Sequence, residues 1–200
     1  MSASTPVLGI QKLHETSDVL QRLENLERRL ISLERRQEDL AREMPDNRIS
    51  IVVMSGDYDR VLAAFVIATG AAAMGLQVSM FFTFWGLSVL RQKRRLRGKA
   101  WMEKAFALLT PVGPDHLALS RLHFAGLGLK LLKRQMRQRN ISSLSDLISL
   151  AQQLGVRMVA CQMSMDVMGF RLGELQPGLE TGGVATFLAD AAKSRATLFI

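Results

Sequence analysis

The sequence has very few of the residues from which cross-linked or metal-clustered proteins are built. Its 200 residues include one cysteine, one tyrosine and three histidines. A single cysteine excludes a disulfide within the chain, and it excludes zinc or iron–sulfur sites that need several cysteines of one chain. Any reaction of Cys161 therefore has to proceed without a second thiol from the same chain.

Acidic residues are also few compared with basic ones. The chain has 26 Lys and Arg against 18 Asp and Glu, a net charge of +8, while a hydrophobic content of 48% excludes a wholly disordered chain. Two runs, 91–99 and 130–139, together hold eleven of the basic side chains. We interpret them first as solvated helix faces, and then as a docking surface for an acidic protein or an anionic membrane surface. Nucleic acid is not expected, because the runs have little aromatic interleaving.

The first residues show neither the basic segment nor the apolar run of a secretory signal, so we expect a cytoplasmic protein, with peripheral attachment to the membrane as an extension. Residues 61–90 contain no charged side chain and precede a basic run, as a membrane helix does. However, the stretch changes at Gly75 from an Ala-rich segment to the β-branched and aromatic LQVSMFFTFWG. We therefore expect a helix followed by a buried strand, and keep a membrane span as the alternative.

Residues 15–44 contain no Gly or Pro and repeat apolar side chains every seven residues, which predicts a coiled-coil helix after a tail at 1–14. The alternative is an amphipathic helix folded back on its own domain. Pro45 ends the helix, and 45–48 form a linker. The heptad positions, called the heptad seam below, are Val19, Leu23, Leu26, Leu30, Leu33, Gln37, Leu40 and Met44.

Residues 49–200 alternate short apolar strands with helices, which predicts a parallel-sheet α/β sandwich. The expected strands are RISIVVMSG, LQVSMFFTFWG, VRMVAC and RATLFI. Ser143 and Asp146 have the spacing of a capping box at the start of a helix that Gly155 ends. Residues of about 91–142 show the least clear pattern of strands and helices, and we expect a basic helical insertion there.

Ligands of parallel α/β sheets bind at the carboxyl ends of the strands, where three loops are expected: 55–57, 85–86 and 161–166. Cys161 comes just before a short helix, MSMDVMG, whose amino end would favour the nucleophilic thiolate. The alternative is a small buried hydrophobic residue. Asp166 and Ser164 are candidates to cap that helix. The candidate site comprises Cys161 as the nucleophile and, in the supporting loops, Ser55, Gly56, Asp57, Met163, Ser164 and Asp166.

Four segments carry a resemblance: NRISIVVMSGDYDRVLAAFVIATGAAAMG, VSMFFTFWGLSVL, VACQMSMDVMG and GGVATFLADAAKS. They resemble the DsrE/DsrF/DsrH-like family of sulfur-relay proteins, and more narrowly its larger single-chain branch, which is sometimes described as peroxiredoxin-like. The resemblance covers about 48–200, with FFTFWGL and CQMSMDVMG as its most specific pieces. It implies an α/β sandwich, homo- or hetero-oligomers, and a persulfide on the cysteine that Cys161 matches.

The resemblance also implies no metal and no organic cofactor, and as partners other small sulfur carriers, notably of the TusA type, and a downstream sulfur-oxidising complex. The resulting hypothesis is a sulfur carrier or sulfurtransferase that accepts sulfane sulfur on Cys161 and passes it to a partner thiol, in dissimilatory sulfur oxidation or a sulfur relay. Because some relatives have a second, resolving cysteine and this chain has none, exchange with a partner is the remaining route. The alternative is a non-enzymatic oligomeric adaptor, or a membrane-associated interaction protein, with a structural cysteine.

Histidines do not suggest a metal site. His116 and His123 are seven residues apart and could share a helix face, but no cysteine or carboxylate cluster accompanies them.

Overall fold

The computed structural model describes residues 7–43, 45–121 and 126–200, and the side chains of its first segment over 20–39. The chain divides into two compact units, residues 1–44 and 45–200. Each unit is considered separately below.

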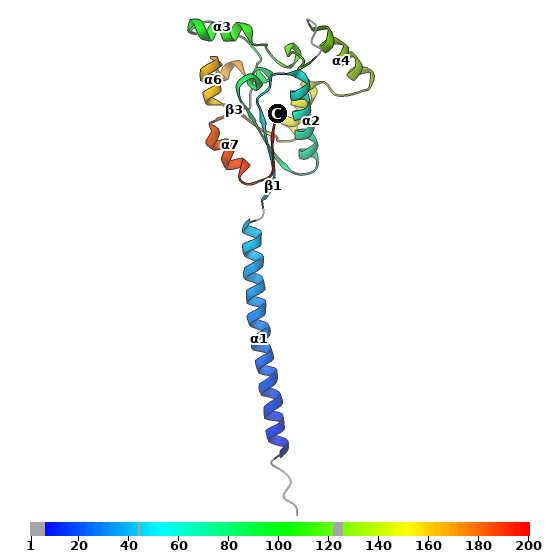
Figure 1. Ribbon diagram of the computed structural model, residues 1–200, viewed down its shortest axis with the longest axis vertical. Coiled ribbons are helices and arrows are strands. Elements are labelled where there is room, and N and C mark those ends of the chain that lie inside the picture. Colours follow the sequence, from blue (N-terminus) through cyan, green and yellow to red (C-terminus); the bar gives the residue numbers. More distant parts are fainter. Residues whose placement is uncertain (1–6, 44, 122–125) are drawn as a thin grey trace, which may run out of the picture. The chain divides into compact units, whose positions relative to one another are not determined.

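The first unit is one long helix, α1, which spans Val7–Glu43 and so begins well before the heptad repeat (Figure 1). All described side chains of α1, those of 20–39, are exposed. The seam leucines Leu23, Leu26, Leu30 and Leu33 are each more than half exposed, so none of the leucines described in this stripe is buried. Pairing of α1 with another helix stays a prediction, and burial of this exposed apolar surface would be its driving force.

The second unit contains a five-stranded sheet with the order β4-β3-β2-β1-β5, and every neighbouring pair in it is parallel. The α/β fold expected from the alternation of strands and helices is therefore confirmed. A short strand, β4, was not expected. The strands are β1 Asp46–Val53, β2 Gln77–Phe82, β3 Arg157–Cys161, β4 Glu180–Gly182 and β5 Ser194–Phe199.

Helices cover both faces of this sheet, with α2 on one side and α6 and α7 on the other (Figure 1). The helices of the domain are α2 Tyr58–Ala73, α3 Trp101–Leu109, α4 Leu127–Gln138, α5 Leu144–Gln153, α6 Gln162–Met168 and α7 Val184–Ala191, and the 3-10 turns are η1 Phe84–Leu90, η2 Pro114–His116 and η4 Leu172–Glu174. The uncharged stretch 61–90 thus becomes most of α2, then β2, then η1. Within the described residues, no helix is long and apolar enough to cross a membrane.

The main core lies between the sheet and the pair α2 and α5. Alternate side chains of the central strands point into it, including Ile51, Met80 and Met158, which lie side by side in the strand register. Phe65 of α2 packs over the sheet with its ring centre 6.0 Å from that of Phe82. The expected capping box at the start of α5 is confirmed, with reciprocal hydrogen bonds between Ser143 and Asp146.

The basic run 91–99 is not a solvated helix face. It has no helix, and its first and last cations, Arg91 and Lys99, are buried. Both form ion pairs with the carboxylate of Glu174, in η4, whose Oε2 lies 2.9 Å from Nη2 of Arg91. The backbone N–H groups of Gln92 and Lys93 donate to the carbonyl oxygen of Glu174. The run therefore adopts an extended path because it wraps around one buried acid, and not because of its own helix propensity.

The Glu174 carboxylate is held in its charged form inside the domain. Burial alone would raise its pKa, but the hydrogen bonds and charges of Lys99 and Arg91 outweigh burial and lower the pKa below its ordinary value. The guanidinium of Arg91 also donates to the carbonyl oxygen of Ala107 and lies 4.8 Å from the ring centre of Phe170. Glu174 thus connects the run 91–99, α3 and the segment after α6.

Replacing Glu174 by glutamine should strongly destabilise the domain, by about 3–5 kcal/mol, because two buried cations would lose their neutralising charge. Lys99→Met should cost much less, since it leaves Arg91 and Glu174 as a neutral pair. The pKa of Glu174 is lower in the folded protein than its ordinary value of 4.5. The stability that Glu174 contributes should therefore be complete above pH 4.5 and should be lost as the pH falls through the lower, folded-state pKa. Urea unfolding of wild type and both variants between pH 3 and 7 measures this. Equal free energies for Glu174→Gln and Lys99→Met at neutral pH would contradict it.

The heptad seam should drive association of α1. A peptide of residues 7–43 should gain helix content as its concentration rises, and sedimentation should show more than one strand. Leu26→Glu with Leu33→Glu should abolish both effects, because it puts charges in the seam. Ile31→Glu serves as the matched control, since Ile31 is equally apolar but lies outside the seam. A monomeric wild-type peptide would refute the pairing.

Candidate functional site

The candidate nucleophile stands at the carboxyl end of a central strand. β3 ends at Cys161, and α6 begins at the next residue. Because every strand of the sheet is parallel, the loops after β1, β2 and β3 emerge at the same edge, as the sequence indicated. The edge therefore contains the three predicted loops, but the strand order places β2 between β1 and β3.

The thiol of Cys161 is enclosed. The residue is only 4% exposed and belongs to a small apolar cluster with Phe81 and Val159, which are partners in the register of β2 and β3. Phe187 of α7 packs against this cluster, with its ring centre 5.6 Å from that of Phe81. The cluster forms the carboxyl half of the sheet face on which α7 lies (Figure 1), and α7 contributes Phe187 to the packing around it.

The amino half of the same face is polar and holds the other end of α7. Asp190 lies one helical turn after Phe187, and its Oδ1 accepts a hydrogen bond from Nη1 of Arg48 at 2.7 Å. Its Oδ2 forms an ion pair with Arg157 and accepts from the hydroxyl of Ser79 at 2.9 Å. Arg157 and Cys161 are the two ends of β3. The helix α7 thus spans one strand from a charged attachment to an apolar one.

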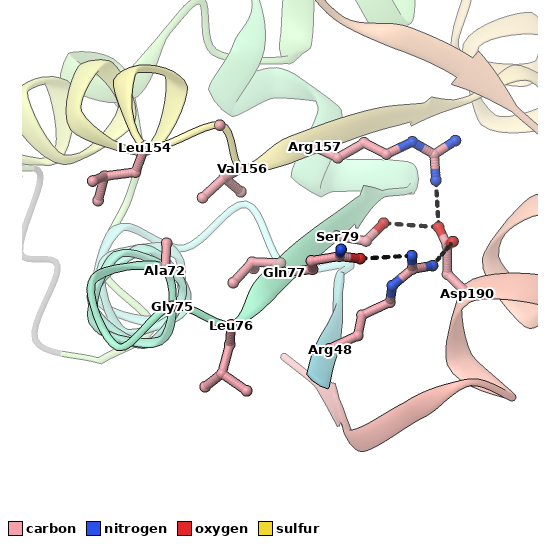
Figure 2. A pocket seen from close by; sticks show the side chains of 12 residues that line it. Arg48, Ala72, Gly75, Leu76, Gln77, Ser79, Leu154, Val156, Arg157 and Asp190 are labelled. Atoms are coloured by element: carbon pink, nitrogen blue, oxygen red, sulfur yellow. Dashed lines mark hydrogen bonds and ion pairs between the residues drawn. The ribbon is translucent and has the colours of Figure 1, made fainter. Parts of the chain in front are cut away.

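A cavity of about 550 Å³ borders this polar half, and Figure 2 shows Arg48, Arg157 and Ser79 around Asp190, with Gln77 beside Arg48. Hydrogen bonds from Arg157 lower the pKa of Glu180, and together Glu180 and Asp190 raise the pKa of Arg157 against its desolvation. Because these charges are paired with one another, we assign the group to the attachment of α7. The cavity lies at the opposite end of β3 from Cys161.

Ser164 holds α6 in place. Its side chain is fully buried, and its hydroxyl oxygen lies 2.7 Å from that of Thr83, the residue after β2. Asp166 and Met163 are exposed, and Asp166 accepts a hydrogen bond from the side chain of Gln162 at 3.0 Å. No side chain caps the amino end of α6, so capping by Asp166 or Ser164 is wrong. A sequence alone does not show that Ser164 pairs with a strand end 81 residues away.

The loop of Ser55, Gly56 and Asp57 lies elsewhere on the edge. These residues line a cavity of about 360 Å³ with Trp85 and Arg60, and Cys161 is not part of its lining. Within it, the hydroxyl of Ser55 accepts the N–H of Asp57 at 3.0 Å, and Asp57 lies 3.6 Å from Arg60. The lining of this cavity does not include Cys161, and the supporting role of the loop stays a prediction.

In the predicted loop 85–86, which follows β2, the close approach of another strand requires a glycine at position 86. A Cβ atom on Gly86 would lie 2.2 Å from the carbonyl oxygen of Val53, closer than any side chain permits. The N–H of Gly86 donates to the carbonyl oxygen of Met54 at 2.9 Å. This close approach fastens η1 to the end of β1 and explains the glycine in FFTFWGL.

Metal ligation finds no support around these residues. Of the two histidines considered from the sequence, His116 ends η2, and His123 lies outside the described residues. In the part of the chain that the structure describes, no three His, Cys, Asp or Glu side chains are grouped so as to hold a metal ion.

These features define a class of protein: a parallel α/β domain that carries a single thiol at the end of its third strand. Residues 45–199 match the model of the DsrE/DsrF/DrsH-like family. The chain belongs to that family.

Two similar proteins each match about three quarters of this chain. An uncharacterized protein, YrkE, of Bacillus subtilis (strain 168) is 44% identical over 154 residues, which are 76% of this chain and 96% of that protein. The sulfur carrier protein DsrE2 of Allochromatium vinosum is 30% identical over 161 residues, 78% of this chain and 100% of that protein. Among solved structures, the ychN protein from E. coli has a TM-score of 0.48 at 11% identity and covers 76% of this chain and 98% of that chain.

Cys161 should react slowly with a thiol reagent in the folded protein, and Phe187→Ala should accelerate the reaction several-fold, because it removes the side chain that covers the apolar cluster. Leu188→Ala is the matched control, since Leu188 is on the same helix but mostly exposed. Reaction with an aromatic disulfide, followed by absorbance, measures the rates, and thermal melting checks that each variant is folded. Equal rates for the two variants would show that α7 does not control access to the thiol.

Proposed function

We propose that this chain is a sulfur carrier that holds sulfane sulfur as a persulfide on Cys161 and passes it to a thiol of a partner protein. Three observations support the proposal. The chain belongs to the DsrE/DsrF/DrsH-like family, a relative at 30% identity over its full length is a sulfur carrier, and Cys161 is the single thiol of the chain. The observation that carries most weight is the position of this thiol at the carboxyl end of β3, next to α6.

The chemistry is an exchange between sulfur atoms and needs no external oxidant. The thiolate of Cys161 attacks the outer sulfur of a donor persulfide, R–S–SH, and forms a new sulfur–sulfur bond. The sulfur–sulfur bond of the donor breaks, and the donor leaves as the thiolate R–S⁻. In the second half, an acceptor thiolate attacks the outer sulfur on Cys161, and the Cys161 thiolate leaves. Charge, atoms and electron pairs balance in each half.

The enclosure of the thiol suits a carrier better than a free catalyst. A persulfide on Cys161 would lie among Phe81, Val159 and Phe187, away from water and small thiols. Transfer then requires α7 to move, and the helix is lightly attached, because none of its residues is fully buried. A partner that displaces α7 gains fast access, whereas a small molecule reaches the thiol only when the helix moves by itself and therefore reacts slowly. Selective delivery follows from this arrangement.

The donor is a protein persulfide and the acceptor a protein thiol, and the acceptor has to be another molecule because the chain has no second cysteine to release the sulfur internally. As donors and acceptors we propose other small sulfur carriers, of the TusA type, and a sulfur-oxidising complex downstream. A homo-oligomer held by α1 would offer several such sites on one particle.

Prolonged incubation with polysulfide, followed until the slow reaction of the enclosed thiol is complete, should add one sulfur atom to the full-length protein, as read by intact-mass spectrometry. The addition should be absent in Cys161→Ser and should be reversed by dithiothreitol, because a thiol removes the outer sulfur of a persulfide.

Failure of the wild type to gain sulfur, or gain that survives Cys161→Ser, would refute the carrier. The buried thiol is also what a non-enzymatic adaptor would have. An adaptor gains no sulfur and keeps its associations in Cys161→Ser, so the same variant separates the two functions.

A further inference from the structure

The helix α3 presents its apolar side to solvent. Trp101, Met102, Leu108 and Leu109 are 75%, 51%, 61% and 82% exposed. At 100° per residue these four side chains fall within one side of the helix, together with Ala105. The usual amphipathic arrangement, with the apolar side inward, is reversed.

The opposite side of α3 is fixed to the domain by small and polar contacts. Ala107 is buried, and its carbonyl oxygen accepts a hydrogen bond from the guanidinium of Arg91 at 3.1 Å. Glu103 packs so closely against Gly169, which ends α6, that a Cβ on that glycine would lie 2.6 Å from the Cβ of Glu103. The exposed apolar side is therefore a consequence of how α3 is seated, and the helix cannot turn it inward without losing these contacts.

A group of exposed cations comes just before α3 in the chain, and two of them lie beside its apolar side chains. Lys93, Arg94, Arg95 and Arg97 precede α3 and are exposed. Among the described residues, no carboxylate side chain forms an ion pair with these four, and Glu174, the nearby buried acid, pairs with Arg91 and Lys99. A groove of about 690 Å³ is lined by Lys93 and Arg94 together with Leu108 and Leu109 of α3. Positive charge and apolar surface thus meet in one groove.

We propose that α3 and the segment 92–97 form a surface that docks on an anionic lipid bilayer. This α3 surface consists of Trp101, Met102, Leu108 and Leu109 with Lys93, Arg94, Arg95 and Arg97.

Its composition is that of a helix lying in a membrane interface, where Trp and Leu enter the acyl boundary and Lys and Arg stay with the headgroups. The net positive charge of the chain strengthens attraction to an anionic surface.

A bilayer fits the surface better than a second copy of the chain does. In a symmetric contact the same patch appears on both partners, so the four cations of one copy would face those of the other. A lipid surface supplies instead both an apolar layer and many phosphates. It also needs no shape match, which suits an apolar side that projects from the domain. The proposal does not depend on the chemistry of Cys161.

Full-length protein should sediment with vesicles of equal parts phosphatidylcholine and phosphatidylglycerol, and not with vesicles of phosphatidylcholine alone. Each phosphate-facing cation contributes about fivefold to such binding. Lys93→Gln with Arg97→Gln should therefore weaken it by more than about tenfold. Trp101→Ser with Leu109→Ser should do the same by removing the apolar contact.

Two matched controls come from α4, which is also basic and amphipathic. Arg137→Gln with Arg139→Gln removes two exposed cations, and Leu127→Ser with Leu131→Ser removes two exposed leucines. Both should leave vesicle binding nearly unchanged, and circular dichroism checks folding of all variants. In a Trp85→Phe variant, the emission of Trp101 alone should shift to the blue on anionic vesicles.

The proposal is overturned by equal binding to neutral and anionic vesicles, by no binding, or by α4 variants that lose as much as the α3 variants. It is also overturned if the α3 variants lower the mass of the particle in solution, because the surface would then be an interface between copies.

Discussion

The attachment of α7 to the sheet is the constraint on which the enclosure of the thiol depends. This helix has no fully buried residue, and it is held by Asp190 at the polar end of the face and by Phe187 at the apolar end. Arg157 and Cys161 are four residues apart on β3, which is why one short helix reaches both. Ion pairs at one end of the strand thus hold the helix whose Phe187 packs against the cluster around the thiol at the other end.

A second buried acid controls the charge of the surface. Glu174 draws Arg91 and Lys99 inside, so that two of the six cations of the run 91–99 neutralise an interior charge. The remaining four are exposed, on an extended segment next to α3. One carboxylate therefore determines which cations of the run are buried and which face solvent. Through Arg91 it also holds α3, whose apolar side faces outward. Net charge alone does not distinguish the two groups.

Local patterns made much of this molecule predictable. The alternation of strand and helix, the capping box of Ser143 and Asp146, and the place of Cys161 before a short helix all depend on neighbours in sequence. The structural roles of Glu174 and Asp190 cannot be predicted from local patterns, because their partners are distant along the chain. Arg91 is 83 residues from Glu174, and Arg48 is 142 residues from Asp190. The run 91–99 has the composition of a helix face, but a distant buried acid overrides its propensity. β4 is too short to give a periodic signal.

Enclosure of the thiol has an energetic consequence for a carrier. If only a small fraction of molecules has α7 displaced, the apparent affinity of a partner for the thiol falls by that fraction. A partner can recover this loss only through contacts that favour the displaced arrangement. Val184 and Leu188 of α7 are exposed and apolar, so they are available for such contacts in the closed state. A small thiol makes no such contacts, and it therefore meets the full cost of moving the helix. Specificity of sulfur delivery would then follow from the need to move α7, and not from the reactivity of the sulfur itself.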